Sequence, residues 1–328
     1  MPEIKNLSYI QAVNHALRWS LETVPNTVVF GEDVAVPGGP FGATKNLHRD
    51  FGVDRVFDLP ISETAFLGMA LGSAMTGLRP IAEIMYSDFL FVAMDQVVNQ
   101  IANIRYTSNG KWGAPLVIRT QQGSSPGACA QHSKSIEAYL AHTPGLRVVC
   151  PTTPMEAYQA IRTAVVSDDP VFVVESRMLY PQKGEVQLDA ELWPMGGARV
   201  VRPGADATIV AWSRTMTAAL EAGEQLAARG VDAEVVDLRW IAPLDVETVA
   251  DSVAKTGRLV IAHDAPGTGG FGGELAARVG ERCFGRLRAP IARVTGIDAP
   301  LPAAPALQDV ALPSADRIAG AVLETMSA

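Results

Sequence analysis

The sequence has few cysteines, few charged residues and no long hydrophobic run. Its three cysteines, Cys129, Cys150 and Cys283, are odd in number and stand outside any CxxC pair, which argues against a disulfide framework and against a thiolate metal site. Charged residues make up 19% of the chain, compared with about 25% in average soluble proteins. We therefore expect part of the surface to be buried against another chain, because interface cores are depleted of charge.

No membrane-spanning, secretory or nucleic-acid-binding segment is predicted. The longest apolar run, residues 65–75, is too short to span a bilayer, and the N-terminal segment lacks the apolar stretch of a signal peptide. The net charge of -8 and the absence of a Lys/Arg cluster argue against nucleic-acid binding. The sequence therefore predicts a soluble, cytoplasmic protein.

Several motifs of common enzyme classes are also missing. The chain has no Walker P-loop, no HExxH, no GxSxG and no GDG sequence. These absences argue against P-loop nucleotide hydrolysis, zinc-dependent proteolysis and the serine-hydrolase elbow.

Short apolar segments alternate with helical periodicity along most of the chain. This alternation is typical of parallel sheets with helices on both faces, and 328 residues suffice for about two domains. We expect two doubly wound α/β domains, over residues 1–190 and 205–328, joined by a linker at 191–204. A polar stretch with glycine and proline, residues 181–204, marks the boundary.

Helix starts and strands can be placed more closely. Two capping boxes, Ser8 with Gln11 and Thr153 with Glu156, predict helix N-termini. Residues 88–106 are predicted to form one long helix, because their apolar and amide side chains recur every three or four residues. The predicted strands are residues 27–30, 80–84, 115–119, 147–150, 171–175, 208–212, 234–238, 258–263 and 291–294.

Residues 267–272 match the GxGxxG pattern of dinucleotide-binding sites. However, residues 263–266 separate the preceding strand from the first glycine, where the pattern requires a tight turn. No acidic residue directly follows the next strand, at Val294, to bind a ribose. A nicotinamide-dependent enzyme is therefore a less favoured alternative.

Glu63, in the segment Pro-Ile-Ser-Glu at residues 60–63, is a candidate for acid–base chemistry. In one interpretation Ser62 caps a helix and Glu63 is a stabilising charge in its first turn. In the other, Glu63 is buried beside the apolar helix that follows. Burial would let the carboxylate keep a proton near neutral pH and exchange it with a ring nitrogen.

His132 is the second candidate. It lies at the end of the polar loop over residues 121–133, and loops at the carboxyl ends of strands bind ligands in open α/β sheets. His132 can transfer protons there, or it can hold the loop by hydrogen bonds. The remaining histidines have no partner signal, and we favour a structural role for them. They are His15, His48, His142 and His263.

Ordered matches along the chain carry a resemblance to one family. They include Gly-Glu-Asp-Val at 31–34, Pro-Ile-Ser-Glu at 60–63 and Gln-His-Ser at 131–133. Further matches are residues 38–41, 54–56, 77–83, 95–99, 144–146, 169–180, 237–239 and 243–245. Over essentially its whole length the chain resembles the β chains of thiamine-diphosphate-dependent 2-oxo acid dehydrogenases, which act on pyruvate, branched-chain 2-oxo acids or acetoin.

The resemblance implies a pyrimidine-binding domain, a transketolase C-terminal-like domain and specific residue roles. Glu63 matches the glutamate facing the cofactor's aminopyrimidine, Phe89 the aromatic packed on that ring, and Ile61 a wall of the pocket. His132 matches the histidine implicated in acyl transfer to lipoamide. The positions that correspond to the family's potassium site are Leu116, Ala164, Val165, Ser167 and Asp169.

The resemblance also implies partners. In this family an α chain with a GDG motif holds the diphosphate and Mg²⁺, and a lipoyl acyltransferase accepts the acyl group. This chain lacks GDG, so we expect a heterotetramer with an α chain. Residues 121–130 depart from the family's glycine-rich loop. An enzyme that forms acyloins without lipoamide, or a non-catalytic subunit, therefore stay open as alternatives.

Overall fold

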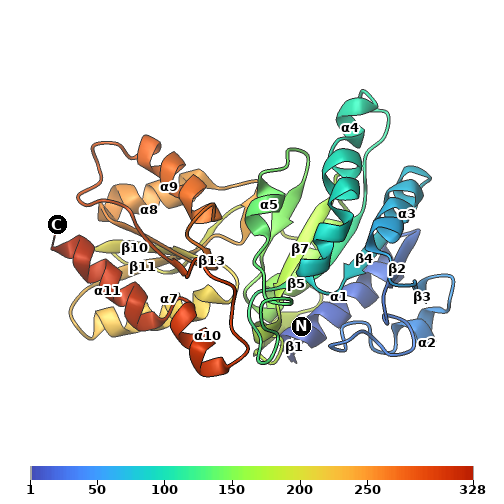
Figure 1. The fold of residues 1–328 in the computed structure, drawn as a ribbon, viewed down its shortest axis with the longest axis horizontal. Coiled ribbons are helices and arrows are strands. Elements are labelled where there is room, and N and C mark those ends of the chain that lie inside the picture. The colour runs from blue at the N-terminus through green and yellow to red at the C-terminus, as the bar shows by residue number, and fades with distance from the viewer. Residues whose placement is uncertain (1, 328) are drawn as a thin grey trace. The chain divides into compact units, whose positions relative to one another are not determined.

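The computed structural model describes residues 2–327, and the chain forms two compact units (Figure 1). The first unit comprises the chain up to Gln122 together with Tyr139–Met195. The second comprises Gly123–Ala138 and the chain from Gly196 onward. The segment 123–138 is thus enclosed by the first unit in sequence but packs with the second, which the residue pattern did not indicate.

The first unit is built on a parallel sheet. Its strands run in the order β6-β7-β5-β4-β2-β3. Their bounds are β2 (Thr27–Gly31), β3 (Val56–Asp58), β4 (Arg79–Ile84), β5 (Val117–Gln122), β6 (Arg147–Val149) and β7 (Val171–Ser176). The chain runs from β2 to β3 on one side and then to β4 on the other. The carboxyl ends of β2 and β4 therefore form the switch point where such sheets bind ligands.

The helices of this part of the chain confirm both predicted capping boxes, at Ser8 and at Thr153. The helices are α1 (Tyr9–Thr23), α2 (Leu47–Phe51), α3 (Glu63–Met75), α4 (Ile104–Thr107), α5 (Glu137–Ala141) and α6 (Pro154–Val165). A 3₁₀ turn, η3, covers Arg177–Leu179. An antiparallel pair, β1 (Ile4–Ser8) with β8 (Lys183–Gln187), lies beside α1 and α6. β8 lies within the polar stretch that predicted only a boundary.

The single helix predicted over residues 88–106 is wrong. The segment is a 3₁₀ turn η1 (Ser87–Ala93), a wide helical turn η2 (Gln96–Ile101) and the short α4. The amide of Asn103 donates to the carbonyl oxygens of Val98 and Asn99, at 3.1 and 3.3 Å. Amide side chains that bond nearby backbone compete with regular helix formation, and periodicity alone does not report this.

A buried charge cluster joins the central strands of the first unit. Arg119 on β5 donates to Glu83 on β4 at 2.6 Å and to Glu175 on β7 at 2.8 Å. The Gln121 amide donates to the same Glu83 carboxylate at 3.1 Å. Burial raises the pKa of Glu175, although Arg119 opposes this. Removing one partner would leave a buried charge unpaired, so the cluster holds these strands in one register.

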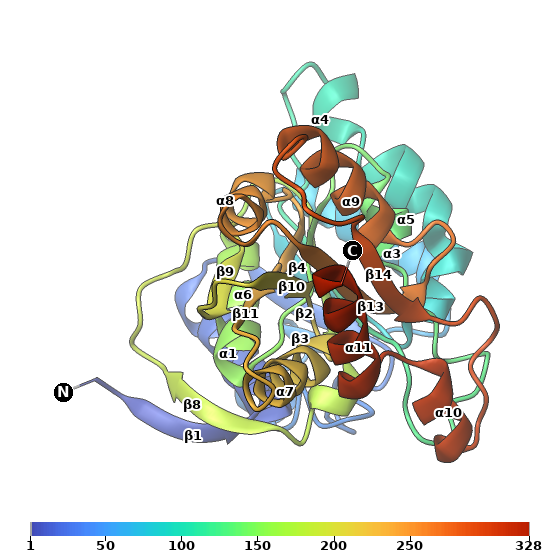
Figure 2. The ribbon, with the colours of Figure 1, turned by 90° about the vertical axis from the view of Figure 1, so that its left-hand side faces the viewer.

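The second unit is also an α/β sheet, with one antiparallel edge (Figure 2). The strand order is β14-β13-β10-β11-β9. The strands are β9 (Arg199–Arg202), β10 (Ala207–Ala211), β11 (Ala233–Asp237), β13 (Leu259–Pro266) and β14 (Ala292–Gly296). A further short strand, β12 (Trp240–Ala242), is not part of this sheet. β9 pairs with β11 in the antiparallel direction and lies in the stretch predicted as linker. The switch point falls between β10 and β13.

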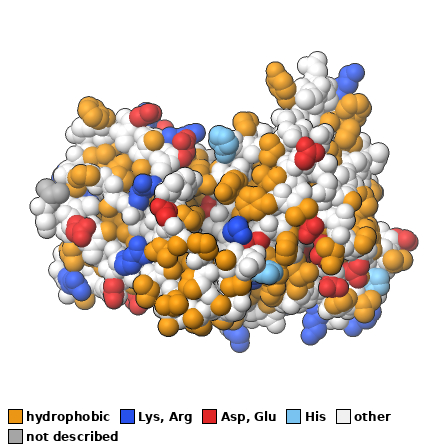
Figure 3. Space-filling view, in the orientation of Figure 1, with side chains coloured by type: hydrophobic (Ala, Val, Ile, Leu, Met, Phe, Trp, Pro, Cys, Tyr) orange, Lys and Arg blue, Asp and Glu red, His pale blue; other side chains and the backbone are white. Residues whose placement is uncertain are grey.

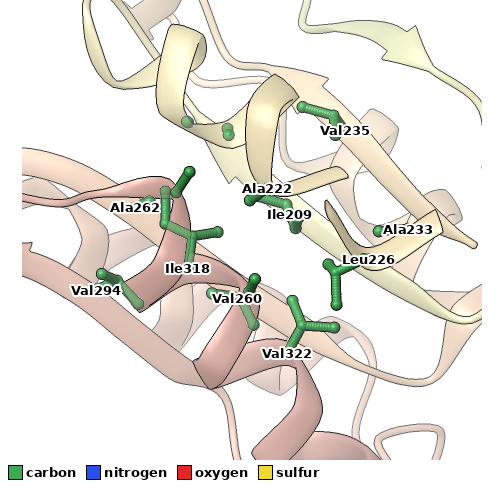
Figure 4. Packing of buried hydrophobic residues seen from close by; sticks show 14 of the residues in the cluster. Ile209, Ala222, Leu226, Ala233, Val235, Val260, Ala262, Val294, Ile318 and Val322 are labelled. Carbon is green, nitrogen blue, oxygen red and sulfur yellow. The ribbon is translucent and has the colours of Figure 1, made fainter. Parts of the chain in front are cut away.

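Helices cover both faces of this sheet, as the predicted doubly wound class requires. They are α7 (Thr215–Ala227), α8 (Val246–Thr256), α9 (Phe271–Arg282), α10 (Pro305–Ala311) and α11 (Ala315–Met326). Ile209, Val260 and Val322 belong to the apolar core between α7, α11 and the sheet (Figure 4). Within the described part of the chain, every helix is too short or too polar to cross a bilayer.

Candidate active site

Glu63 lies at the switch point of the first unit, in the first turn of α3. Only 6% of its surface is exposed. Within residues 2–327, no side chain or backbone group donates a hydrogen bond to its carboxylate. Ser62 precedes the helix but its hydroxyl makes no capping bond, so the capping role predicted for Ser62 is wrong. Glu63 is therefore a largely buried residue whose carboxylate can accept a hydrogen bond from outside the chain.

A second carboxylate, Glu32, lies near Glu63. Glu32 directly follows β2, and its Oε1 atom is buried without a hydrogen-bond partner among the described residues. Burial raises the pKa of Glu32, and the charges of Glu63 and Asp33 raise it further. Sequence reasoning did not single out Glu32 as a site residue. The available signal was an acidic residue directly after a buried strand at the ligand-binding edge of the sheet.

Aromatic side chains gather at the carboxyl end of β4. The rings of Tyr86 and Phe89 lie 6.4 Å apart, and Phe41 packs edge-on against Tyr86 at 5.8 Å. The Arg177 guanidinium covers the Tyr86 ring at 4.5 Å. Phe89 is 36% exposed, so part of its ring is available to a planar ligand. The exposed Ile61 side chain lies two residues before Glu63.

His132 is in the second unit, whereas Glu63, Phe89 and Ile61 are in the first. We call the segment Gly123–Ala138 the His132 loop. Residues 123–134 of this loop are closed by a hydrogen bond, because the Gly123 amide donates to the Lys134 carbonyl oxygen at 3.0 Å. His132 is half-buried, and its own amide lies 3.5 Å from the Cys129 carbonyl oxygen. The histidine is thus carried by a closed loop rather than by a strand or helix.

The switch point of the second unit holds a buried histidine. His263 on β13 is fully buried, and its ring stacks on Trp212 at 5.1 Å with an 18° angle between the planes. A Cβ atom on Gly270 would lie 2.6 Å from the ring Cε1, and one on Gly272 would lie 2.6 Å from Nε2. These glycines of the GxGxxG motif therefore make room for a side chain of the protein itself, as expected if the motif is not a dinucleotide site.

The segment that matches the potassium site presents mainly backbone oxygens. The carbonyl oxygens of Val165 and Ser167 accept hydrogen bonds from Arg79 Nη1, at 3.0 and 2.8 Å. The carbonyl oxygens of Leu116 and Ala164 accept backbone amides. A carbonyl oxygen has two lone pairs, so these groups can still bind a cation, although they share it with a guanidinium.

The carboxylate of Asp169 does not add to this donor set. It is bound by Arg105 at 2.5 Å and by Arg147 at 2.9 Å. Burial favours its neutral form, but the two arginines outweigh burial and hold the pKa of Asp169 below its usual range. A cation here would be bound through backbone oxygens alone.

Comparisons with known proteins match both units. Residues 5–183 match the family model of the transketolase pyrimidine-binding domain, and residues 196–318 match that of the transketolase C-terminal domain. A pyruvate dehydrogenase E1 component subunit beta from Leifsonia xyli subsp. xyli is 45% identical over 97% of this chain and 94% of its own length. The chain belongs to the E1 β-subunit family of thiamine-diphosphate-dependent dehydrogenases.

Other E1 β-family relatives differ in substrate. The beta subunit of 2-oxoisovalerate dehydrogenase from Bacillus subtilis is 39% identical over 97% of this chain and 98% of its own length. The beta subunit of acetoin:2,6-dichlorophenolindophenol oxidoreductase from Cupriavidus necator is 40% identical over 98% of both. A solved split-gene transketolase, described as an inactive beta4 tetramer, shares the fold. It has a TM-score of 0.78 and 24% identity over 98% of this chain and 99% of its own.

Proposed function

We propose that this chain is the catalytic β subunit of an enzyme that decarboxylates a 2-oxo acid, or cleaves acetoin, with thiamine diphosphate. The observation that carries the proposal is Glu63, a residue only 6% exposed whose carboxylate has no hydrogen-bond donor among the described residues. A carboxylate so placed can accept a hydrogen bond from a donor outside the chain. A protonated ring nitrogen of an aminopyrimidine is a donor of that kind.

The residues present fit such a ring. The Glu63 carboxylate would hold and exchange a proton with the ring nitrogen, and Glu32, whose own pKa is raised by burial and by the Glu63 charge, lies beside it. The exposed part of the Phe89 ring would stack on the pyrimidine, with Ile61 as an apolar wall. When bound, thiamine diphosphate supplies the nucleophilic carbon and the electron sink for decarboxylation.

His132 is assigned to the acyl-transfer step. We propose that it donates a proton as the acyl group passes to the lipoyl group of an acyltransferase partner. Its half-buried position in a polar loop supports this role, because an imidazole can both accept and donate a proton. If the enzyme forms acyloins without lipoamide, no acyl transfer to a lipoyl domain should be measurable, with or without a substitution of His132.

The first unit also supports an α partner. The chain has no GDG motif for the diphosphate and Mg²⁺, and α3 exposes Ala65, Met69 and Gly72 along one face. The Gln96 side chain already lies against Gly68, whereas a Cβ on Gly72 would meet no atom within 4 Å. Hydrophobic side chains are visible on the surface over the first unit (Figure 3). We assign this α3 face to a subunit interface.

A potassium ion bound by Leu116, Ala164, Val165, Ser167 and Asp169 remains part of the proposal, through their backbone oxygens. The ion would stabilise the turn before β7 and would not take part in the reaction. A cytoplasmic location likewise stays a prediction.

Reconstitution tests the proposed function. The chain would be expressed alone and together with an α chain that carries GDG, and both would be titrated with thiamine diphosphate and Mg²⁺ by calorimetry. We expect micromolar binding and dye-linked oxidation of a 2-oxo acid or acetoin only with the α chain. Gly72→Leu should leave the isolated chain folded but prevent assembly. Tight binding by the isolated chain would contradict the division of the cofactor between two chains.

A further inference from the structure

The second switch point lies beside another segment of the chain itself. In open α/β sheets this crevice ordinarily takes a ligand, and here it lies where Trp212 directly follows β10 and Asp264 lies in the last part of β13. The His132 loop packs with this unit. A Cβ atom on Gly123, at the start of the loop, would lie 3.9 Å from Asp264 Oδ2.

Two side chains of the second unit hold the His132 loop near its ends. Trp212 donates from Nε1 to Glu137 Oε1 at 3.3 Å, and both residues are almost fully buried. Gln308 on α10 donates from Nε2 to the Ser125 carbonyl oxygen at 3.2 Å, and its exposure is 6%. His132 lies between these two anchor points in sequence.

The anchors are themselves fixed. Trp212 is clamped between the stacked His263 ring and the edge of Phe271, 6.1 Å away. Gln308 also donates to the Pro302 carbonyl oxygen at 2.8 Å. Beside Trp212, Arg214 binds Asp264 through two hydrogen bonds of 2.8 and 2.9 Å. A loop fastened to such groups loses little entropy when it has to present a side chain in one geometry.

We propose that Trp212 and Gln308 are positioning residues for His132, so that the C-terminal unit sets the geometry of acyl transfer. The inference rests on the proposed function, which gives His132 its role. Trp212 and Gln308 belong to the second unit, whereas Glu63 and Phe89 belong to the first. Loosening an anchor should therefore slow acyl transfer and spare decarboxylation.

The test uses the complex with its α chain and two half-reactions. Trp212→Phe keeps a ring beside His263 but removes the donor, and Gln308→Met keeps length but removes the amide. Gln225→Met is the matched control, because Gln225 donates to Asp316 at 3.0 Å on the exposed surface. Decarboxylation is measured with a dye acceptor, and acyl transfer with a lipoyl domain.

We expect each anchor variant to lower kcat for transfer roughly fivefold, the factor for one lost hydrogen bond. KM for the lipoyl domain and the dye-linked rate should stay within about twofold, and the control should change neither. In the His132→Ala background the anchor substitutions should have no further effect, because the residue they position is gone.

Equal losses in both half-reactions, or full additivity with His132→Ala, would overturn the inference and leave the anchors a merely structural role. Loss of transfer in His132→Ala with normal transfer in both anchor variants would also overturn it, while the proposed function stands. Normal transfer in His132→Ala would overturn the role of His132 itself, and the inference with it.

Discussion

The two units share one construction but use their switch points in opposite ways. In the first, Glu32 and Glu63 lie close enough at the carboxyl edge of the sheet for their charges to interact, and Glu32 Oε1 is buried without a hydrogen-bond partner among the described residues. In the second, the Asp264 carboxylate is held by Arg214 and Thr215, and the chain's own loop packs beside it. The carboxylates of the first switch point are thus left to an outside donor, whereas the carboxylate of the second is used inside the chain. At the second switch point, the buried His263 ring nitrogens have no hydrogen-bond partner among the described residues, and they face neighbouring parts of the chain itself.

The sharpest test of this contrast is Glu63→Gln, which keeps shape but removes the titrating carboxylate. In the complex with its α chain, C2 proton exchange of bound thiamine diphosphate should slow by roughly 10²–10⁴-fold, as for a lost acid–base group. NMR of quenched samples would measure the exchange.

Glu274→Gln is the matched control for Glu63→Gln. Glu274 is also a first-turn helix glutamate, on α9, but it is exposed and pairs with Arg278. The Glu274→Gln substitution should leave the rate of C2 proton exchange nearly unchanged. If Glu63→Gln behaves like Glu274→Gln, then Glu63 is only a helix charge and the first switch point is no catalytic site.

The buried histidine of the second switch point should make the free energy of unfolding depend on pH in the acidic range. Burial lowers the pKa of His263 from 6.5 to about 4, although Asp264 opposes this. Below pH 6.5 the unfolded chain binds a proton that the folded chain excludes. The free energy of unfolding should therefore fall between about pH 6.5 and 4, by roughly 3 kcal/mol, and this term should be constant above pH 7.5.

Urea unfolding at pH 7.5 and pH 4.5 measures the loss. Other acidic groups also titrate in this range, so the wild-type chain is compared with His263→Phe, which keeps a ring beside Trp212 but takes up no proton. The variant should lose less stability on acidification. An identical loss in both chains would mean that His263 does not contribute to the pH dependence of the free energy of unfolding.

Replacing a glycine of the GxGxxG motif should have a smaller effect on the stability of the second unit. Gly272→Ala would place a methyl group 2.6 Å from His263 Nε2 and should destabilise the second unit by about 1–3 kcal/mol through overpacking. Gly280→Ala, later on α9, meets only Ile291 at 3.7 Å and should stabilise by up to about 1 kcal/mol. Thermal unfolding distinguishes them. A stable Gly272→Ala chain would reopen the nucleotide interpretation of the motif.

The smallest expected effect concerns potassium. Because three arginines surround the segment 164–169, ion binding through backbone oxygens should add less than about 1 kcal/mol. Unfolding temperatures in potassium chloride and in choline chloride at equal ionic strength would measure it. Equal temperatures would remove the ion from the proposal.

Much of this arrangement could be predicted from the residues. The strands β2 and β7 contain continuous apolar runs, and the capping boxes at Ser8 and Thr153 are local signals that the structure keeps. The strand β3 has only three residues, which is too short for a strand periodicity to be recognised in the sequence. The segment 88–106 has helical periodicity, but the Asn103 side chain bonds the backbone and breaks its regularity.

The candidate site was predictable to a different degree. Glu63, Phe89, Ile61 and His132 came from resemblance, and their roles stay predictions. Glu32, Trp212 and Gln308 were not singled out, because each gains its meaning from a neighbour distant in sequence. Sequence patterns report local periodicity, whereas a carboxylate pair or a loop anchor exists only after the chain has folded.

Because the His132 loop packs with the second unit, the two units are difficult to produce as separate fragments. Because Gly123–Ala138 is enclosed by the first unit in sequence but packs with the second, no single cut of the backbone releases both units complete. A fragment starting at Gly196 would leave the Trp212 indole without its acceptor and uncover a surface that is buried in the whole chain. Gene fission or domain exchange at residue 195 would therefore succeed only if the recipient supplied an equivalent loop.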